Sequence, residues 1–466
     1  MATLRFGIGV RDITPLYPVM LHGYASRDRL SGERPEDRVS EPVSASALAL
    51  EASGSAGGRT RVAIVALDMI GVHAAEIVML RTAIARATGL RDHEILIAGS
   101  HSHFAPCIST QHLYPPELGV LDPDPRFVAE VTQRVVEAVT QAFSSLETGT
   151  LESYRVAVPS VLFNRRAVTR ASGARPAVET NFLYPEKPEL YSFSPVDPEL
   201  SAIRLTTASG PKAVLANFGC HPVTGGADGP RSQFCISSDY PFYLRETVTR
   251  AWGCPVLFTL GAAGDAVPLK RTGTSRQEIG GTLGNALLMG ERVFAASGRR
   301  GQGEAALSSR IFEMEAKTIV STRGKDVERS YQEARRKLLG MPQPQSGPQS
   351  PEREAAVRDF LTKARLAYRA RLYPEDRFTI QVQLIRVGEL VLVCLPFEVL
   401  SEVSLRLKAA FSQTVLVSIA NGYEGYLPFA YEYDRGGYEA TPESTHFERS
   451  TADRLVERIL QELKSF

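Results

Sequence analysis

Continuous apolar runs alternate with amphipathic stretches through most of the chain. The apolar runs 62–67 and 95–98 flank the stretch 74–88, in which apolar residues recur at helical spacing. A strand–helix–strand order whose strands are apolar throughout is typical of parallel α/β pairing. We therefore predict strands joined by crossover helices and assign the chain to the α/β class, in its mixed α+β form.

The same pattern predicts the other regular elements. Helical spacing indicates helices over 126–143, 240–252, 275–296 and from about 449 to the end, and apolar runs indicate strands over 4–10, 44–50, 151–158, 203–205, 212–218, 256–260, 311–314, 379–387, 390–395 and 415–419. The polar, proline-rich segment 168–196 is predicted to be a long loop, and a loop of this length is often functional.

A helical hairpin is predicted near residue 350. Helical periodicity covers 325–339 and 351–372, and the intervening segment 341–350 is rich in Pro, Gln and Ser. Ser350 and Pro351 suit the N-cap and the first position of the second helix. We expect 325–373 to be an insertion in a single catalytic domain that spans 1–466.

Several apolar runs end shortly before a side chain suited to chemistry, namely His101, His221, Asp265 and Glu398. Ligands of α/β proteins bind outside the carboxyl ends of strands. Two histidines and one carboxylate, with a position left open for water, form a known catalytic zinc set. Each residue alone has a structural explanation, as a turn residue or a helix-terminal carboxylate. Their shared position at strand ends favours a metal site there.

Two histidines follow the run 95–98 closely, in the sequence Gly-Ser-His-Ser-His-Phe-Ala-Pro at 99–106. If the extended backbone continues, His101 and His103 point to the same side. They would then form part of a metal site or supply a catalytic base. The alternative is a pair of hydrogen-bonded loop histidines.

Composition narrows the function classes. The 466 residues carry 53 Lys and Arg against 52 Asp and Glu, with no long run of either sign, so we predict no nucleic-acid partner. The 5 cysteines form no CxxC pair, which fits free thiols in a reducing compartment. We find neither a signal peptide nor an apolar stretch of about 20 residues, and therefore expect a cytoplasmic protein without a transmembrane segment. The oligomeric state stays open, with a homo-oligomer among the options.

Short motifs between residues 5 and 440 together resemble those of the neutral/alkaline (non-lysosomal) ceramidases, a family of zinc amidases. The similar segments are 7–15, 99–106, 164–165, 217–222, 264–268, 395–398, 421–426 and 437–440. The chain is thereby similar to the N-terminal domain of that family, as a divergent member that lacks the small C-terminal domain.

The resemblance also implies a site. The zinc ligands would be His101, His221, Glu398 and Tyr426, and the catalytic residues would be His103, Arg165, Tyr438 and Asp265. Zinc lowers the pKa of bound water to about 7 and polarises a carbonyl. A histidine beside the metal can carry a proton to the leaving amine, and a tyrosine or arginine can stabilise the oxyanion. Tyrosine is an unusual metal ligand, so Tyr426 is only an oxyanion donor in the alternative assignment.

Several positions depart from the family motifs. Val267 stands where the family has a serine, Phe104 and Ala105 stand in place of Ser-Gly, and Phe397 replaces a glycine. The predicted zinc ligands match the family motifs, whereas these neighbouring positions, which we associate with substrate binding, differ from them. This favours a small or acyl-bearing substrate other than ceramide.

We therefore predict a zinc-dependent amidohydrolase, in which metal-bound water attacks the carbonyl of a small-molecule or acyl-amide (or ester) substrate. A true ceramidase or another N-acyl lipid amidase is the first alternative. A metal-dependent lactonase, cyclase or phosphoester hydrolase would need the same ligands. A metal-binding homologue without turnover is the alternative from outside the enzymes. Asp68 and Asp239 either orient the ligand histidines or cap turns.

Overall fold

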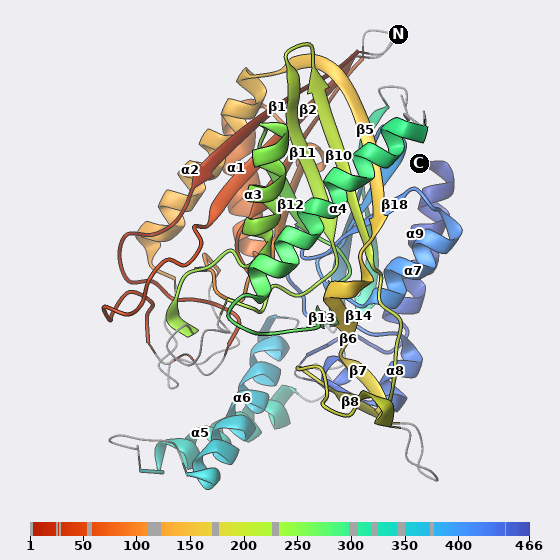
Figure 1. The fold of residues 1–466 in the computed structure, drawn as a ribbon. Coiled ribbons are helices and arrows are strands. Elements are labelled where there is room, and N and C mark those ends of the chain that lie inside the picture. Colours follow the sequence, from red (N-terminus) through yellow and green to blue (C-terminus); the bar gives the residue numbers. More distant parts are fainter. Residues whose placement is uncertain are drawn as a thin grey trace.

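A mixed eight-stranded sheet lies at the centre of the structure, in the order β12-β11-β10-β5-β1-β2-β3-β4 (Figure 1). The computed structural model describes residues 3–24, 27, 29–53, 58–109, 123–169, 177–225, 233–297, 306–318, 324–342, 350–372, 377–442 and 444–466. The strands of this sheet are β1 (Thr3–Asp12), β2 (Ser44–Ser53), β3 (Arg59–Leu67), β4 (Ile95–Gly99), β5 (Glu147–Ala157), β10 (Glu199–Thr207), β11 (Gly210–Phe218) and β12 (Val256–Leu260).

A four-stranded sheet stacks on one face of the eight-stranded sheet. Its strands, in spatial order, are β14 (Leu307–Lys317), β15 (Arg377–Val387), β16 (Leu390–Cys394) and β18 (Thr414–Val417). Phe6, Leu50 and Ile64 of the larger sheet share one buried cluster with Ile385 and Leu392 of the smaller sheet. Many strands are therefore covered on both faces, and this explains why they are apolar throughout although most of them pair antiparallel.

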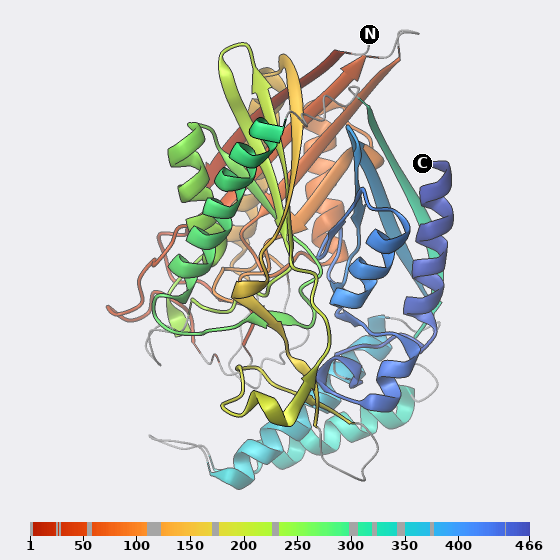
Figure 2. The same cartoon turned by 45° about the vertical axis from the view of Figure 1, so that its right-hand side comes forward.

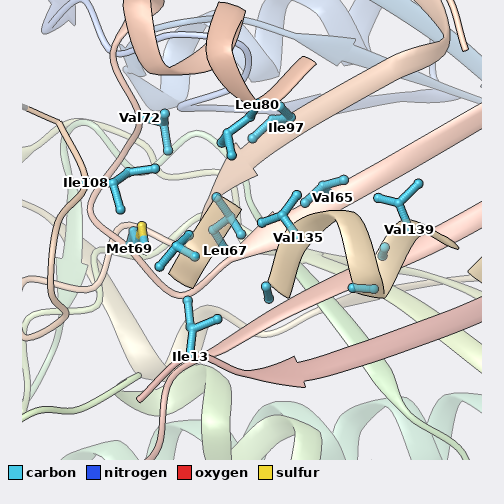
Figure 3. Close-up of a cluster of buried hydrophobic side chains, with 14 of the residues drawn as sticks. Ile13, Val65, Leu67, Met69, Val72, Leu80, Ile97, Ile108, Val135 and Val139 are labelled. Atoms are coloured by element: carbon cyan, nitrogen blue, oxygen red, sulfur yellow. The ribbon is translucent and has the colours of Figure 1, made fainter. Parts of the chain in front are cut away.

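Helices cover the outer face of each sheet. On the larger sheet, α1 (Ala74–Thr88) and α2 (Pro125–Ser144) pack on β1–β4, where Val135 and Val139 of α2 join Val65 and Leu67 of β3 in one core (Figure 3). Helices α3 (Tyr240–Trp252) and α4 (Ser275–Ser297) pack on β10–β12. On the smaller sheet lie α7 (Ser401–Ala410) and α9 (Thr451–Ser465) (Figure 2). The layers therefore run helix, sheet, sheet, helix.

The predicted crossover connections are present at several strand pairs. Helix α1 joins the parallel strands β3 and β4, α3 joins β11 and β12, and α7 lies between β16 and β18. The other ladders within the two large sheets are antiparallel. The prediction of a mixed α/β fold is confirmed.

Some short elements differ from the prediction. The segment 168–196, predicted as a loop, contains β8 (Val178–Thr180) and β9 (Tyr191–Phe193), which pair with β7 (Arg166–Thr169). Strands of this length are too short to show an alternating pattern. Helix α7, whose buried residues include Val403 and Leu407, has no counterpart among the predicted elements.

Helices α5 (Gly324–Leu339) and α6 (Pro351–Leu372) form the predicted hairpin beyond one end of the sheets (Figures 1 and 2). Tyr331 of α5 stacks on Phe360 of α6, with the ring centroids 5.7 Å apart. Residues 343–349 of the predicted linker lie outside the described residues, and the single-domain assignment stays a prediction. Among the helices that the structure describes, none is long and apolar enough to cross a membrane.

Candidate metal centre

The segment that follows β18 joins the two edges of the large sheet. The amide of Ser418 donates to the carbonyl of Leu260 at the end of β12 (2.8 Å), and the amide of Asn421 donates to the carbonyl of Ile97 in β4 (2.7 Å). The carboxyl ends of β4, β11 and β12 therefore lie near one another. The short strand β17 (Glu398–Val399), which follows β16, is part of the same region.

His101 leaves the strand conformation that precedes it. Its φ is 67°, so the extended backbone that would have pointed His101 and His103 to the same side does not continue beyond Ser100. The turn is held by the His101 amide, which donates to Met69 O (2.8 Å), and by His101 Nδ1, which lies 2.7 Å from Ile70 O. The rings of His101 and His103 nevertheless meet, with their Nε2 atoms 3.4 Å apart.

His221 and Glu398 lie against His101, and we call these three residues the metal cluster. The Nε2 atoms of His101 and His221 are 3.3 Å apart. Glu398 Oε2 lies 3.1 Å from His221 Nε2 and 3.2 Å from His101 Nε2. His221 Nδ1 bonds to the carbonyl of Ala263, in the loop after β12. The structure thus brings together three buried side chains that the sequence places at separate strand ends.

The hydrogen bonds around the metal cluster fix the tautomers of its histidines. A backbone carbonyl only accepts hydrogen bonds, so the Nδ1 atoms of His101 and His221 carry the protons. Their Nε2 atoms then present lone pairs to each other and to the carboxylate of Glu398. Acceptors that converge in a buried site repel one another unless a proton or a metal cation lies between them. The donor set fits zinc, and two histidines with one carboxylate also suit ferrous iron.

Burial sets the protonation of these side chains. Burial lowers the pKa of His221 to about 4 and holds that of His103 well below the ordinary histidine value. Burial alone would raise the pKa of Glu398, but the adjacent His101 and His221 hold it well below the ordinary value. Neutral pH therefore gives uncharged imidazoles at His103 and His221 and a charged carboxylate at Glu398, the forms that bind metals.

His103 has one nitrogen at the metal cluster and one without a fixed bond. Its ring can place a nitrogen within 4.8 Å of nitrogens from His101 and His221. Among the described residues, its buried Nδ1 finds no hydrogen-bond partner. Tyr24 packs on the ring, with centroids 5.1 Å apart, and Gly23 permits this because a Cβ there would lie 2.8 Å from His103. A ring in this position suits proton transfer.

A second polar group lies beside the metal cluster. Arg165 Nη2 donates to the Tyr426 hydroxyl (3.0 Å), and Arg165 Nε donates to Glu439 Oε1 (2.6 Å). Arg166 Nη1 donates to the other oxygen of Glu439 (2.6 Å). The ring of Tyr438 lies 5.5 Å from that of Tyr426 and 5.6 Å from the guanidinium carbon of Arg165. We call these five residues the arginine wall.

Tyr426 connects the arginine wall to the metal cluster. It pairs with Glu398 in the parallel ladder of β17 and β19 (Tyr426–Leu427). Burial and the charge of Glu398 raise the pKa of Tyr426 well above the ordinary tyrosine value. The hydroxyl is therefore protonated at neutral pH, and it can donate a hydrogen bond or approach a cation as a neutral ligand.

The carboxylate of Asp265 bonds to residues outside the metal cluster and the arginine wall. One oxygen accepts from the amide (2.8 Å) and the hydroxyl (2.7 Å) of Ser401, and the other accepts from Asn164 Nδ2 (2.8 Å). These bonds tie the loop after β12 to the start of α7 and to the residue before Arg165. The contacts give Asp265 a positioning role, and its predicted catalytic role stays a prediction.

The ligand histidines are oriented by backbone carbonyls rather than by Asp68 or Asp239. Asp68 accepts two hydrogen bonds from Arg245, at 2.9 and 2.8 Å. Asp239 caps α3 and accepts from the amide of Thr224 (2.6 Å). The alternative prediction of a cap or turn carboxylate is supported for Asp239, whereas Asp68 forms an ion pair with Arg245.

Two residues of the site have no predicted role. The hydroxyl of Tyr423 donates to Glu398 Oε1 (2.8 Å), and Glu439 bridges the two arginines of the arginine wall. Both stand inside segments that resemble family motifs, 421–426 and 437–440. Their position in these motifs was the only available signal, because neither contact is local in sequence.

The fold was compared with known proteins. No family model matches the chain, and no curated protein matches it. The neutral ceramidase from Pseudomonas aeruginosa matches with a TM-score of 0.69 and 19% identity, over 99% of this chain and 74% of that one. The two chains share a fold. A ceramidase complexed with C2 also matches, with a TM-score of 0.69 and 17% identity, over 100% of this chain and 76% of that one. The likeness to ceramidases, first indicated by short motifs, therefore holds for the fold.

Proposed function

We propose that the protein is a zinc-dependent amidohydrolase that cleaves an amide, or an ester, of a small or acyl-bearing substrate. The convergence of three buried acceptors carries the proposal, because the Nε2 atoms of His101 and His221 and Glu398 Oε2 lie 3.1 to 3.3 Å apart. A metal ion between the three acceptors would stabilise this arrangement. The solved structures with this fold are named ceramidases, which makes an amide the first substrate class to test.

His101, His221 and Glu398 would hold the zinc ion, with Tyr426 as a further ligand or as a hydrogen-bond donor. When bound, zinc supplies a Lewis acid for the carbonyl and lowers the pKa of a water molecule to about 7. The carbonyls of Ile70 and Ala263 already fix both imidazoles in the tautomer that binding requires.

His103 would transfer the proton. It adjoins ligand His101, and its lowered pKa leaves the imidazole neutral and able to accept a proton from the attacking water. It would then give that proton to the nitrogen of the leaving amine as the carbon–nitrogen bond breaks. The unpartnered Nδ1 leaves the second nitrogen of the ring available for this exchange.

The arginine wall would stabilise the negative oxygen that forms on the attacked carbonyl. Arg165 donates to the Tyr426 hydroxyl, and Tyr426 pairs with Glu398 in the ladder of β17 and β19, so both side chains come from positions beside the metal cluster. Glu439 holds the guanidinium of Arg165, and this fixed orientation is what makes such donors effective. Tyr438, packed on the same group, would contact the substrate.

Two departures from the family motifs bear on the substrate. Val267 is fully buried in β13 (Ala266–Pro268), and Phe104 is buried against Tyr24 and Arg27. Both side chains therefore fill space with apolar atoms where a hydroxyl or a smaller group would stand. We infer that the amide substrate is smaller than ceramide.

Metal analysis tests the proposal. Wild-type protein and His101→Ala are washed with chelator, resupplied with zinc, iron(II) or manganese, and analysed for bound metal and for hydrolysis of N-acyl amides and esters. We expect about one zinc per wild-type chain, hydrolysis of an amide, and loss of both in the variant. No bound metal in the wild-type protein would overturn the proposal. Bound zinc without hydrolysis across amides, esters, lactones and phosphoesters would leave a metal-binding protein.

A further inference from the structure

Exposed aromatic side chains lie directly beside the arginine wall. The ring of Phe182 is 46% exposed, and its centroid lies 5.3 Å from the guanidinium carbon of Arg165 and 5.7 Å from the ring centroid of Tyr438. Tyr184, two residues further along the chain, is 42% exposed. Two residues span at most about 7 Å, so both exposed rings lie within reach of one small ligand. Exposed apolar patches of this kind mark binding sites when they adjoin a functional group.

Two further rings support Tyr184 from below. Phe163 lies in β6 (Leu162–Asn164), the strand that leads into the arginine wall, and meets Tyr184 edge to face with the centroids 5.1 Å apart. Phe193 of β9 stacks on Tyr184 at 5.7 Å and meets Phe163 at 6.0 Å. We call Phe163, Phe182, Tyr184 and Phe193 the aromatic shelf. The exposed ring of Tyr184 therefore belongs to a packed group of rings rather than standing alone on the surface.

Hydrogen bonds hold the aromatic shelf against the arginine wall. The short strands β6, β7 and β8 follow one another beyond the end of the large sheet (Figure 1). The amide of Asn181, which precedes Phe182, donates to Arg165 O (2.8 Å), and the amide of Tyr438 donates to Thr180 Oγ1 at the end of β8 (2.9 Å). The ladder of β7 with β9 holds the other side of the shelf. The same segments thus position the shelf and the two polar residues beside it.

The contacts of the aromatic shelf place it at the acyl half of an amide substrate. In the proposed function, Arg165 and Tyr426 stabilise the oxygen of the attacked carbonyl, and Phe182 packs on Arg165. His103, which would serve the leaving amine, packs on Tyr24 and on the histidines of the metal cluster instead. The group bonded to the carbonyl carbon therefore lies on the side of the shelf.

The size and chemistry of the aromatic shelf favour a ring over a long chain. Strands β8 and β9 have three residues each, and strands of this length span about 10 Å. This length suits one ring on a short linker, whereas a fatty chain would extend beyond the shelf. Aromatic rings prefer edge-to-face or stacked partners, the two geometries that the rings of the shelf already adopt with one another.

We propose that the aromatic shelf binds an aromatic ring on the acyl half of the substrate. The inference rests on the proposed function and names its substrate class as amides of short acids that carry an aryl group, such as N-phenylacetyl amines. Hydrolysis adds water across the carbon–nitrogen bond and releases the aryl-substituted acid and the free amine. Phe182 and Tyr184 then determine specificity for the acyl group.

A matched series of acyl groups tests the inference. N-phenylacetyl-, N-cyclohexylacetyl-, N-octanoyl- and N-acetyl-ethanolamine share one amine half, and the first two differ only in whether the six-membered ring is aromatic. For the wild-type protein we expect the highest kcat/KM on the phenylacetyl substrate, roughly 2- to 10-fold above the cyclohexylacetyl substrate. In Phe182→Ala and in Tyr184→Ala the ratio of phenylacetyl to acetyl kcat/KM should fall roughly 3- to 10-fold.

Two further variants separate ring contact from general effects. Phe182→Leu keeps an apolar side chain but removes the ring, so the ratio of phenylacetyl to cyclohexylacetyl kcat/KM should fall toward one. Tyr431 is an exposed tyrosine of α8 (Ala430–Arg435) that stacks on Phe429, and Tyr431→Ala should keep the wild-type ratios. An equal fall of the ratios in Tyr431→Ala and Phe182→Ala would overturn the inference. A wild-type preference for the octanoyl substrate would overturn it as well.

Vesicle binding tests whether the aromatic shelf contacts a lipid surface instead. Wild-type protein and Tyr184→Ala are sedimented with vesicles of phosphatidylcholine and phosphatidylglycerol. We expect no difference between the two proteins in the bound fraction. Loss of vesicle binding in Tyr184→Ala, together with unchanged ratios in the acyl series, would overturn the inference and assign the shelf to lipid contact.

A binding measurement separates this inference from the proposed function. Calorimetry of N-phenylacetyl-ethanolamine with wild-type protein, Phe182→Ala and Tyr184→Ala requires no turnover when the protein is zinc-free. Weaker binding by either variant than by the wild type supports the aromatic shelf even if the zinc-loaded protein cleaves no amide, in which case only the proposed function fails. Equal binding by the wild type and both variants overturns the inference even if amides are cleaved.

Discussion

In the metal cluster, the carbonyl of Ile70 fixes His101 and the carbonyl of Ala263 fixes His221. In the arginine wall, by contrast, the carboxylate of Glu439 fixes both Arg165 and Arg166. The histidines depend on backbone carbonyls at strand ends, and a side-chain substitution nearby leaves those carbonyls in place. The arginines depend on one buried carboxylate, and a single substitution removes it. Substitutions in the metal cluster should therefore change the metal content, whereas substitutions in the arginine wall should change the free energy of unfolding.

The largest expected effect is on the metal cluster. His221→Ala removes a ligand but also relieves the repulsion among buried acceptors, so the fold should persist while bound metal and hydrolysis both fall to background. Metal analysis, circular dichroism and activity on the best amide substrate measure this. His93→Ala is the control, because its side chain lies outside the site and both properties should stay at the wild-type level. Full activity in metal-free His221→Ala would refute the mechanism.

The next effect separates proton transfer from metal binding. His103→Ala should keep about one zinc per chain while kcat falls by roughly 10²- to 10⁴-fold, the usual contribution of a general acid–base group. The measurement pairs metal analysis with steady-state kinetics. If zinc is lost together with activity, His103 is a zinc ligand and belongs to the metal cluster.

Substitution of Glu439 in the arginine wall should lower the free energy of unfolding. Glu439→Gln keeps the size of the side chain but leaves Arg165 and Arg166 without the carboxylate that they share, which should cost about 3–5 kcal/mol of unfolding free energy. Activity should fall because Arg165 loses its fixed orientation, whereas metal content should persist. Urea unfolding and metal analysis of the same samples measure both.

Glu432→Gln is the matched control for that change. Glu432 contacts Arg166 but not Arg165, and Arg166 keeps its bond to Glu439. The Glu432→Gln substitution should lower the free energy of unfolding less than Glu439→Gln does, and should leave kcat close to the wild-type value. Equal kinetic effects of the two variants would show that the arginine wall acts as one structural block rather than through Arg165.

The sequence predicted the metal cluster better than the arginine wall, and the contrast above explains why. An apolar run followed by a histidine or a carboxylate is visible in one segment, so His101, His221 and Glu398 could be assigned to strand ends. The contact between Arg165 and Glu439 spans 274 residues and joins a residue that follows a short strand to a 3-10 helix over Tyr438–Ala440. No periodicity records such a pairing, and Arg165 and Tyr438 entered the prediction only through resemblance to family motifs.

Local geometry was the part of the cluster that the sequence did not predict. The left-handed turn at His101 depends on hydrogen bonds to Met69 and Ile70, which follow a different strand. The second sheet, which covers the first, likewise decides that antiparallel strands are apolar on both faces. In both cases tertiary contacts override what a local pattern indicates.

The smallest expected effect tests whether a side chain outside the metal cluster helps to position the residues that would bind the metal. Tyr423 donates to Glu398 Oε1 at 2.8 Å and leaves Oε2 facing the histidines. Tyr423→Phe removes only that hydroxyl, so zinc affinity should fall about 10-fold, at the low end for a residue that orients a ligand, while the fold persists. Competition with a chromogenic chelator measures the affinity. Tyr433→Phe, which loses a hydroxyl bond to Phe447 O away from the cluster, should leave the affinity unchanged. Equal zinc affinity in wild type and Tyr423→Phe would mean that backbone contacts alone position the ligands, and would make the contrast with the arginine wall complete.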